Sequence, residues 1–258
     1  MRIGLVSDVH GNLPALRVAL DALGEEGYDR LLCPGDLVGY GPFPNECVAL
    51  LAESGAVCVA GNHDLMALER LELPRNQLVR VTNEWTREVL DADARRYLEG
   101  LPLIVESDGV VMGHGSLTDP TVYVTPERAG AEMTRFAAED PGRSLLVLGH
   151  THTPLAYGER RGAVLEGRDG RVSIEPGERL LVNPGSVGQP REWRALVRYA
   201  VIDLDAGEVR YGASGYDERP VREALRERGL PPDACHRRPP PRELARRGWV
   251  RARSRLAR

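Results

Sequence analysis

The chain has 258 residues, a net charge of −4 and a composition, 42% hydrophobic and 28% charged, that is typical of a globular protein. Its length allows one large domain or two small ones with a sizeable core. No apolar run reaches the roughly 18–20 residues of a membrane helix, the N-terminus lacks a signal segment, and the four cysteines form no CxxC pair. We therefore expect a cytoplasmic protein with reduced thiols and no membrane partner.

The first part of the chain alternates between strands and helices. Apolar patterning predicts strands at 3–7, 31–33 and 57–60, separated by helices at 13–23 and 44–52. This β-α-β-α-β order indicates parallel strands with helices on the face of the sheet.

The remainder of the body is predicted to be helical at first and then mostly antiparallel β. Residues 64–99 have a largely helical pattern, and a further helix is expected at 127–138. Two Asp-Gly turns, at 108–109 and 169–170, lie between pairs of predicted strands, which is a hairpin signal. The expected strands of this half are 103–105, 110–112, 145–148, 163–166, 171–174, 180–182, 196–204 and 208–211.

The last 40 residues differ from the body in charge. All 34 basic residues of the chain are arginine, and residues 219–258 contain 13 of them with 4 acidic residues, a net of +9, so that residues 1–218 carry −13. We predict a domain at 1–215 and a basic, proline-rich extension at 216–258, helical or partly disordered, with a short helix after Pro220 and a second one from about Arg242.

Two interpretations of this extension stay open. Its arginines suit contacts with nucleic-acid phosphates or with a protein partner. Alternatively it is a solvated extension in an arginine-rich protein, which we favour because the body is acidic and offers no large nucleic-acid surface.

Six predicted strands end in small residues or in side chains that can bind metals. The stretches are Asp8-Val9-His10, Gly35-Asp36, Gly61-Asn62-His63-Asp64, Gly113-His114-Gly115, Gly149-His150-Thr151-His152 and Asn183-Pro184-Gly185-Ser186. Ligands of open α/β sheets bind at the carboxyl ends of strands. Because residues i and i+2 of a strand share a face, we expect Asp8 to converge with His10, and His150 with His152.

Five of the six histidines lie in these stretches, and only His236 lies elsewhere. A single such histidine is most simply a hydrogen-bonded, half-buried imidazole, but five of them beside Asp8, Asp36 and Asn62 favour a metal site. Imidazole, carboxylate and amide groups without thiolate suit Mn, Fe, Zn, Ni or Co. These side chains are too many for one tetrahedral ion, so we expect two divalent ions roughly 3.5–4 Å apart that share a carboxylate.

The same stretches resemble a known family. DVH at 8–10, GD at 35–36, GNHD at 61–64, GH at 113–114 and GHTH at 149–152 resemble, in order and spacing, the five sequence blocks of the calcineurin-like metallophosphoesterases. NPGS at 183–186 resembles a further block of the small prokaryotic phosphodiesterases in that superfamily. The resemblance covers residues 1 to about 212 and implies an α/β fold, a four-layer α/β/β/α sandwich with two mixed sheets.

The resemblance also implies the roles of the site residues. It assigns Asp8, His10 and His152 to one metal, Asn62, His114 and His150 to the other, and Asp36 to a bridging position. It implies in-line attack of a metal-bridging hydroxide on a phosphodiester or phosphomonoester, with manganese as the expected metal and a small, nucleotide-like phosphoester as the expected substrate. His63 is the catalytic histidine, a general acid or a charge stabiliser near the leaving group.

Three further residues are given two interpretations each. Asn12 either orients phosphate or caps the helix that starts at residue 13. Asp64 either supports a metal ligand from behind or caps a helix. Arg191 either touches substrate or reflects the general use of arginine in this chain.

Departures from the family pattern reduce the number of candidate functions. Gly39 and Tyr40 stand where the protein Ser/Thr phosphatases of the superfamily have an Asp-Arg pair, and Ala60 stands where they have an arginine that grips phosphate. This argues against a phosphoprotein phosphatase and removes the Asp that would orient His63.

Two other readings of the chain remain open, a non-catalytic scaffold on the same fold and a nuclease or phosphatase that uses the arginine-rich extension. The scaffold is disfavoured, because every ligand position is filled and His63 is present. The sequence carries no signal for an oligomeric state.

Overall fold

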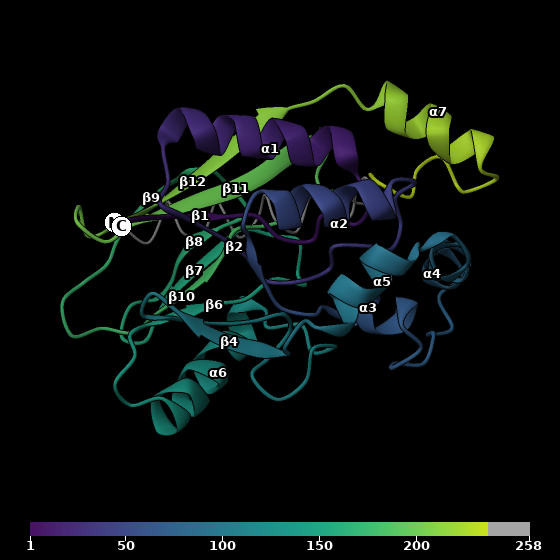
Figure 1. Ribbon diagram of the computed structural model, residues 1–258. Helices are drawn as coiled ribbons and strands as arrows, with labels where there is room; N and C mark the ends of the chain where they lie inside the picture. The colour runs from purple at the N-terminus through teal and green to yellow at the C-terminus, as the bar shows by residue number, and fades with distance from the viewer. Residues whose placement is uncertain (237–258) are drawn as a thin grey trace.

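Two six-stranded β-sheets stacked face to face organise the chain in the computed structural model, which describes residues 1–236 (Figure 1). In spatial order the first sheet contains β3 (Val57–Cys58), β2 (Arg30–Cys33), β1 (Arg2–Leu5), β11 (Leu196–Asp203), β12 (Glu208–Gly215) and β9 (Gly170–Ser173). The second contains β4 (Ile104–Ser107), β5 (Val110–Gly113), β6 (Leu145–Val147), β10 (Leu180–Asn183), β7 (Leu155–Gly158) and β8 (Gly162–Glu166).

Some helices cover the outer faces of the sheets, and residues 1–236 contain seven helices in all. They are α1 (Leu13–Glu26), α2 (Pro44–Glu53), α3 (Asn62–Ala67), α4 (Gln77–Val89), α5 (Ala92–Glu99), α6 (Pro126–Glu139) and α7 (Arg219–Glu227). None of these helices, within the part of the chain that the structure describes, is both long enough and apolar enough to cross a bilayer.

Alternation of side chains along the strands builds the layers. On β2, Leu31 and Cys33 pack with the buried faces of α1 and α2, while Leu32 points into the core between the sheets. Met112 of β5 meets Leu32 in that core, and Phe136 of α6 packs on the outer face of the second sheet. Figure 1 shows α1 and α2 on one side of the sheets and α6 on the other. The predicted four-layer α/β/β/α sandwich is confirmed.

Both sheets are mixed. In the first, β1 pairs in parallel with β2 and antiparallel with β11, and β2 pairs in parallel with β3. In the second, β6 pairs in parallel with both β5 and β10, while β10 pairs antiparallel with β7. The second half of the chain is therefore less uniformly antiparallel than its pattern predicts.

The hairpin expected around residues 169–170 does not form. The strand before this turn, β8, pairs with β7 in one sheet, whereas the strand after it, β9, pairs with β12 in the other. The turn therefore carries the chain from one sheet to the other. The pattern also missed β7, whose four residues lie between Pro154 and the loop after Gly158.

The chain beyond β12 stays packed against the sandwich as far as residue 236. As predicted, a short helix, α7, forms around Pro220. Val221, Leu225 and Leu230 are buried in one cluster with Tyr40, and Gln189 donates a hydrogen bond to the Ala234 carbonyl (2.6 Å). The division into two domains at residue 215 stays a prediction, and the basic helix expected from Arg242 lies outside the described residues.

Candidate metal centre

The predicted site residues lie in loops that follow strands of both sheets. The loops carry, in chain order, Asp8 and His10 after β1, Asp36 after β2, His114 after β5, and His150 and His152 after β6, while Asn62 follows β3 as the first residue of α3. The ends of these strands meet at one edge of the sandwich, so the structure brings all seven residues together, as the resemblance implies.

Five of these residues have a left-handed backbone. Their φ angles run from 50° to 65°, and they are Asp8, His10, Asp36, His150 and His152. Each such conformation costs a non-glycine residue roughly 1–2 kcal/mol, and strain of this kind is concentrated at functional sites.

The expectation that Asp8 and His10 share a strand face is therefore wrong. The strand β1 ends at Leu5, and the turn beyond it makes the two side chains converge. Hydrogen bonds from Asp8 N to Gly35 O (3.1 Å) and from His10 N to Asp36 O (2.9 Å) hold this turn against the loop after β2. The left-handed turn at His150 and His152 likewise replaces the expected strand.

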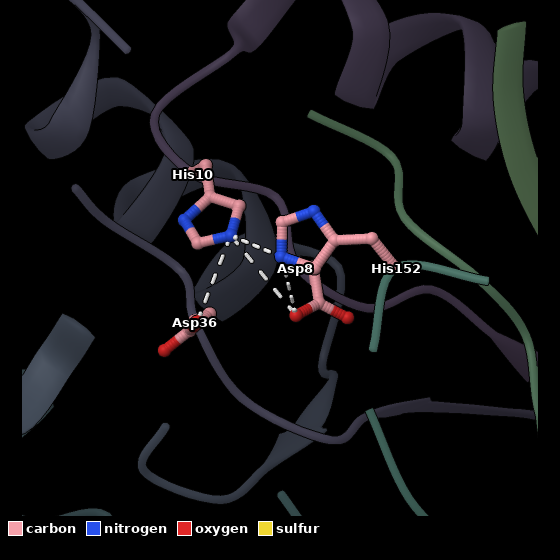
Figure 2. A group of neighbouring side chains, drawn as sticks. All are labelled: Asp8, His10, Asp36 and His152. Carbon is pink, nitrogen blue, oxygen red and sulfur yellow. Dashed lines mark hydrogen bonds and ion pairs between the residues drawn. The ribbon is translucent and has the colours of Figure 1, made fainter. Parts of the chain in front are cut away.

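The first cluster consists of Asp8, His10, Asp36 and His152 (Figure 2), all buried, and one ligand atom from each lies within 4.8 Å of the others. His10 Nε2 lies 3.1 Å from His152 Nε2 and 3.6 Å from Asp36 Oδ2. His152 Nε2 lies 3.3 Å from Asp8 Oδ1.

The positions of the ring protons in this cluster suit the binding of a cation. His10 Nδ1 faces the Val38 carbonyl (3.1 Å) and His152 Nδ1 faces the Gln189 carbonyl (2.8 Å). A carbonyl oxygen only accepts, so both Nδ1 atoms carry the proton and both Nε2 atoms present lone pairs to each other. Among residues 1–236, Asp36 Oδ2 also has no hydrogen-bond partner although it is buried. Opposed lone pairs and an unpartnered carboxylate oxygen fit a bound divalent cation.

The second cluster consists of Asp36, His114 and His150, so Asp36 belongs to both clusters. His114 Nε2 lies 3.2 Å from Asp36 Oδ2 and 3.0 Å from Asn62 Oδ1. His114 Nδ1 donates to the Pro34 carbonyl (2.6 Å). His150 donates through the other nitrogen, from Nε2 to the Thr121 carbonyl (3.0 Å), which leaves Nδ1 as its ligand atom.

Burial and neighbouring charges shift the pKa values of these groups. Burial lowers the pKa of His10 and of His152 well below the usual range and raises the pKa of Asp8 to about 7. Burial also lowers the pKa of His150 to about 3. His114 differs: burial acts to lower its pKa, but the Asp36 carboxylate beside it raises the value to about 9. In the metal-free protein at neutral pH, His114 therefore keeps its charge and the other ligand histidines are neutral.

Asp64 holds the loop that carries Asp36. Its carboxylate accepts hydrogen bonds from the backbone N–H groups of Asp36, Leu37, Val38 and Gly61 at 2.8–3.1 Å. Gly61 is needed at this contact, because a Cβ there would overlap the Asp36 carboxylate. Both interpretations of Asp64 therefore describe its contacts, since it caps the start of α3 and supports Asp36 from behind.

The Asn12 side chain makes its hydrogen bonds to other groups of the protein. Its Oδ1 accepts from Ala15 N (3.3 Å) at the start of α1, and its Nδ2 donates to Gly188 O (2.9 Å) and to Tyr216 Oη (3.1 Å). The side chain is fully buried. These contacts favour the capping interpretation over phosphate binding.

His63 is buried next to the first cluster, and burial lowers its pKa to about 4. Its ring lies 4.8 Å from the His10 ring and 4.5 Å from the Tyr40 ring, measured between centroids. The Asp expected to orient it is absent, but Asn83 of α4 takes that place, with Nδ2 3.0 Å from His63 Nδ1. The sequence signal for Asn83 is weak: it is one of three buried polar residues, with Thr82 and Thr86, on the inner face of α4.

Arg191 and Tyr123 lie beside the second cluster. The Tyr123 ring, 41% exposed, stacks on His150 with 4.0 Å between centroids. The Arg191 guanidinium lies 5.6 Å from the Tyr123 ring centroid, and its Nε is buried without a hydrogen-bond partner within residues 1–236. Burial first and the Arg191 charge second lower the pKa of His152, so this charge acts inside the site.

Fold and site together define a metal-dependent phosphoester hydrolase: a four-layer sandwich whose strand ends hold two joined clusters of His and Asp ligands. Residues 1–207 match the model of the calcineurin-like phosphoesterase superfamily domain, and the chain belongs to this family.

Relatives agree with this assignment. The crystal structure of a metallophosphoesterase from Sphaerobacter thermophilus is 33% identical with a TM-score of 0.79, covering 91% of this chain and 96% of that one. An uncharacterized protein of Methanocaldococcus jannaschii is 30% identical over 236 residues, which cover 89% of this chain and 93% of that protein. Phosphodiesterase YfcE of Escherichia coli is 26% identical over 195 residues, which cover 73% and 86%, respectively.

Proposed function

We propose that this chain is a dinuclear phosphoesterase that hydrolyses phosphodiester or phosphomonoester bonds by in-line displacement at phosphorus. The observation that supports it most strongly is the position of Asp36 in both ligand clusters. Asp8, His10 and His152 would hold one ion, and Asn62, His114 and His150 the other, with Asp36 between them. This set of nitrogen and oxygen ligands suits manganese, and Fe, Zn, Ni or Co in its place. Two such ions supply a nucleophile from water at neutral pH and neutralise charge on the phosphoryl group.

The side chains beside the second cluster, Arg191 and Tyr123, favour a small, nucleotide-like substrate. Arg191 offers a buried, unpartnered guanidinium nitrogen for a phosphate oxygen. Tyr123 is backed by His150 on one face of its ring and remains 41% exposed, which suits stacking of a nucleobase. A guanidinium and an aromatic ring side by side match the phosphate and the base of one nucleotide.

A catalytic role fits the site better than a scaffold role. A scaffold on this fold has no need for the five left-handed residues, whose strain is sustained only because the surrounding loops hold them. His63 would serve neither a scaffold nor metal binding, since it belongs to neither ligand cluster.

The test is hydrolysis of bis-p-nitrophenyl phosphate and p-nitrophenyl phosphate by the full-length protein with added Mn²⁺. We expect metal-dependent turnover and two bound ions per chain by metal analysis. Asp36→Asn should abolish turnover and lower the metal content, because Asp36 serves both clusters. Asp21→Asn, on the exposed side of α1, is the matched control and should keep full activity.

Absence of turnover on every generic ester, with two ions bound, would refute the proposal and favour the scaffold. If turnover is found, a panel of 2′,3′-cyclic nucleotides and dinucleoside polyphosphates identifies the preferred substrate. The exposed face of Tyr123 predicts a lower KM for nucleotides than for alkyl phosphates.

A further inference from the structure

The five histidines of the site differ in the group that each ring nitrogen faces. Four of them, His10, His114, His150 and His152, donate one ring N–H to a backbone carbonyl at 2.6–3.1 Å. The other nitrogen of each ring is therefore the atom that faces the ligand clusters. His63 is the exception, because its Nδ1 faces a side-chain amide at 3.0 Å.

The orientation of that amide is determined by a second contact. Asn83 Nδ2 also lies 2.9 Å from the Val79 carbonyl, one turn earlier on α4. This carbonyl only accepts, so the amide atom beside it is the NH2 group and not the oxygen. The two hydrogens of Nδ2 are then directed at Val79 O and at His63 Nδ1, and His63 Nδ1 must accept.

We propose that Asn83 is a positioning residue that holds His63 as a neutral imidazole with its proton on Nε2. This inference rests on the proposed function and deepens it. His63 then acts as a hydrogen-bond donor to a phosphoryl or leaving-group oxygen, and not as a metal ligand, a base or a general acid. A neutral imidazole that gave up its Nε2 proton would become an imidazolate, so His63 stabilises charge without transferring a proton.

The surroundings of His63 agree with this role. Within residues 1–236 the His63 ring makes its hydrogen bond through Nδ1, which leaves the Nε2 N–H for a ligand. A Cβ on Gly39 would overlap His63 Nδ1, so Gly39 leaves room for the ring beside Asn83. An Asp in this position, as the resemblance to the protein phosphatases implies, would instead accept a hydrogen bond from a protonated Nδ1. Asn83 therefore reverses the hydrogen bond as well as replacing the residue.

The direct test is the tautomer of His63 in the full-length protein loaded with Zn²⁺, which is diamagnetic. Long-range ¹H–¹⁵N correlation spectra distinguish protonated from unprotonated ring nitrogens, and His63→Gln assigns the signal. We expect protonated Nε2 and unprotonated Nδ1. A proton on Nδ1, alone or with one on Nε2, would overturn the proposal. This measurement needs no turnover, so it is independent of whether the proposed function holds.

The kinetic test is a double-mutant cycle on the Mn²⁺-loaded protein. His63→Ala should lower kcat by about 10²-fold, as expected for loss of one donor to developing charge, and Asn83→Leu by about 10-fold with an unchanged KM, since the imidazole remains but is no longer held. In the His63→Ala background, Asn83→Leu should have no further effect, because Asn83 acts only through His63. Additive losses would show a merely structural role and refute the proposal.

Thr86→Val is the matched control for this cycle. Thr86 is buried on the same face of α4, one turn from Thr82, and its hydroxyl donates to the Thr82 carbonyl and not to His63. The variant should keep kcat within about twofold, because Thr86 has no contact with His63 and the Asn83 amide stays in place beside it. A loss at Thr86→Val equal to that at Asn83→Leu would attribute the effect to packing of α4.

Discussion

The two ligand clusters share Asp36 but differ in depth and in the protons they hold. The first is enclosed by protein, since His10 packs against Tyr40 and His63. The second lies beneath the half-exposed Tyr123 ring and beside Arg191. The substrate should therefore reach the site from the side of the second cluster.

The two clusters also differ in the protonation states of their ligands. In the first cluster His10 and His152 are neutral, and Asp8, with a pKa of about 7, is the group that must lose a proton. In the second, His114 has a pKa of about 9 and stays charged against Asp36 at neutral pH. A metal ion must displace that proton. The first site should therefore fill before the second at neutral pH.

Among variants that act on one cluster only, Asp8→Ala should have the largest effect, because it removes a metal ligand from the first cluster. We expect one bound ion in place of two, an intact fold and a loss of turnover of about 10³-fold, since a catalytic metal supplies several kcal/mol. Metal analysis counts the bound ions, circular dichroism checks the fold, and steady-state kinetics measures turnover. Two ions retained with full activity would break the assignment of Asp8.

The pH dependence of metal binding separates the two clusters directly. Affinity for the first site should rise up to about pH 7 and then level off, because Asp8 is ionised above that pH. Affinity for the second should rise about tenfold per pH unit towards pH 9, because His114 releases one proton on binding. Over pH 6 to 8 that is a change of about 100-fold.

Calorimetry with Mn²⁺ at several pH values, in buffers of different ionisation enthalpy, counts the protons released. Equal slopes for both sites would contradict the difference between the clusters. In His150→Ala the first-site slope should persist, which serves as the internal control.

Arg191→Ala should weaken substrate binding and leave metal binding unchanged. Because hydrogen bonds to charged groups contribute about 1.5–3 kcal/mol, we expect KM to rise about 10- to 100-fold with two ions still bound. Steady-state kinetics on one diester measures it, and Arg191→Lys should recover part of the loss. A change in metal content instead would assign Arg191 to the first cluster, where its charge acts on His152.

Much of this arrangement could be predicted from apolar runs and the residues after them. The predicted strands 31–33, 110–112 and 145–148 each end close to an observed strand, so Asp36, His114 and the GHTH stretch were placed at strand ends correctly. For the GHTH stretch, as for Asp8 and His10, the prediction was wrong only in the local backbone geometry, which is a turn and not a strand. Left-handed turns at Asp8 and His10 depend on backbone bonds to the loop after β2, and those bonds join residues that are distant in sequence.

Long-range pairing explains the other failures. An Asp-Gly turn at 169–170 predicts a hairpin locally, yet β9 pairs with β12, which follows more than thirty residues later. The choice of sheet is settled by the packed core and not by the turn. Asn83 was missed for a related reason: a single amide within a helix belongs to no motif, and only the fold brings it to His63.

Tyr123 variants should have the smallest effect, and they test most selectively whether substrate binds beside the second cluster. Tyr123→Ala should raise KM for a 2′,3′-cyclic nucleotide about fivefold, the lower end of the about 1–3 kcal/mol that stacking on one base contributes, and should leave KM for an alkyl phosphodiester unchanged. Tyr123→Phe keeps the ring over His150 and should match the wild type on both substrates. An equal rise on both would mean that Tyr123 acts by covering His150 and the second cluster, because loss of that cover affects every substrate alike.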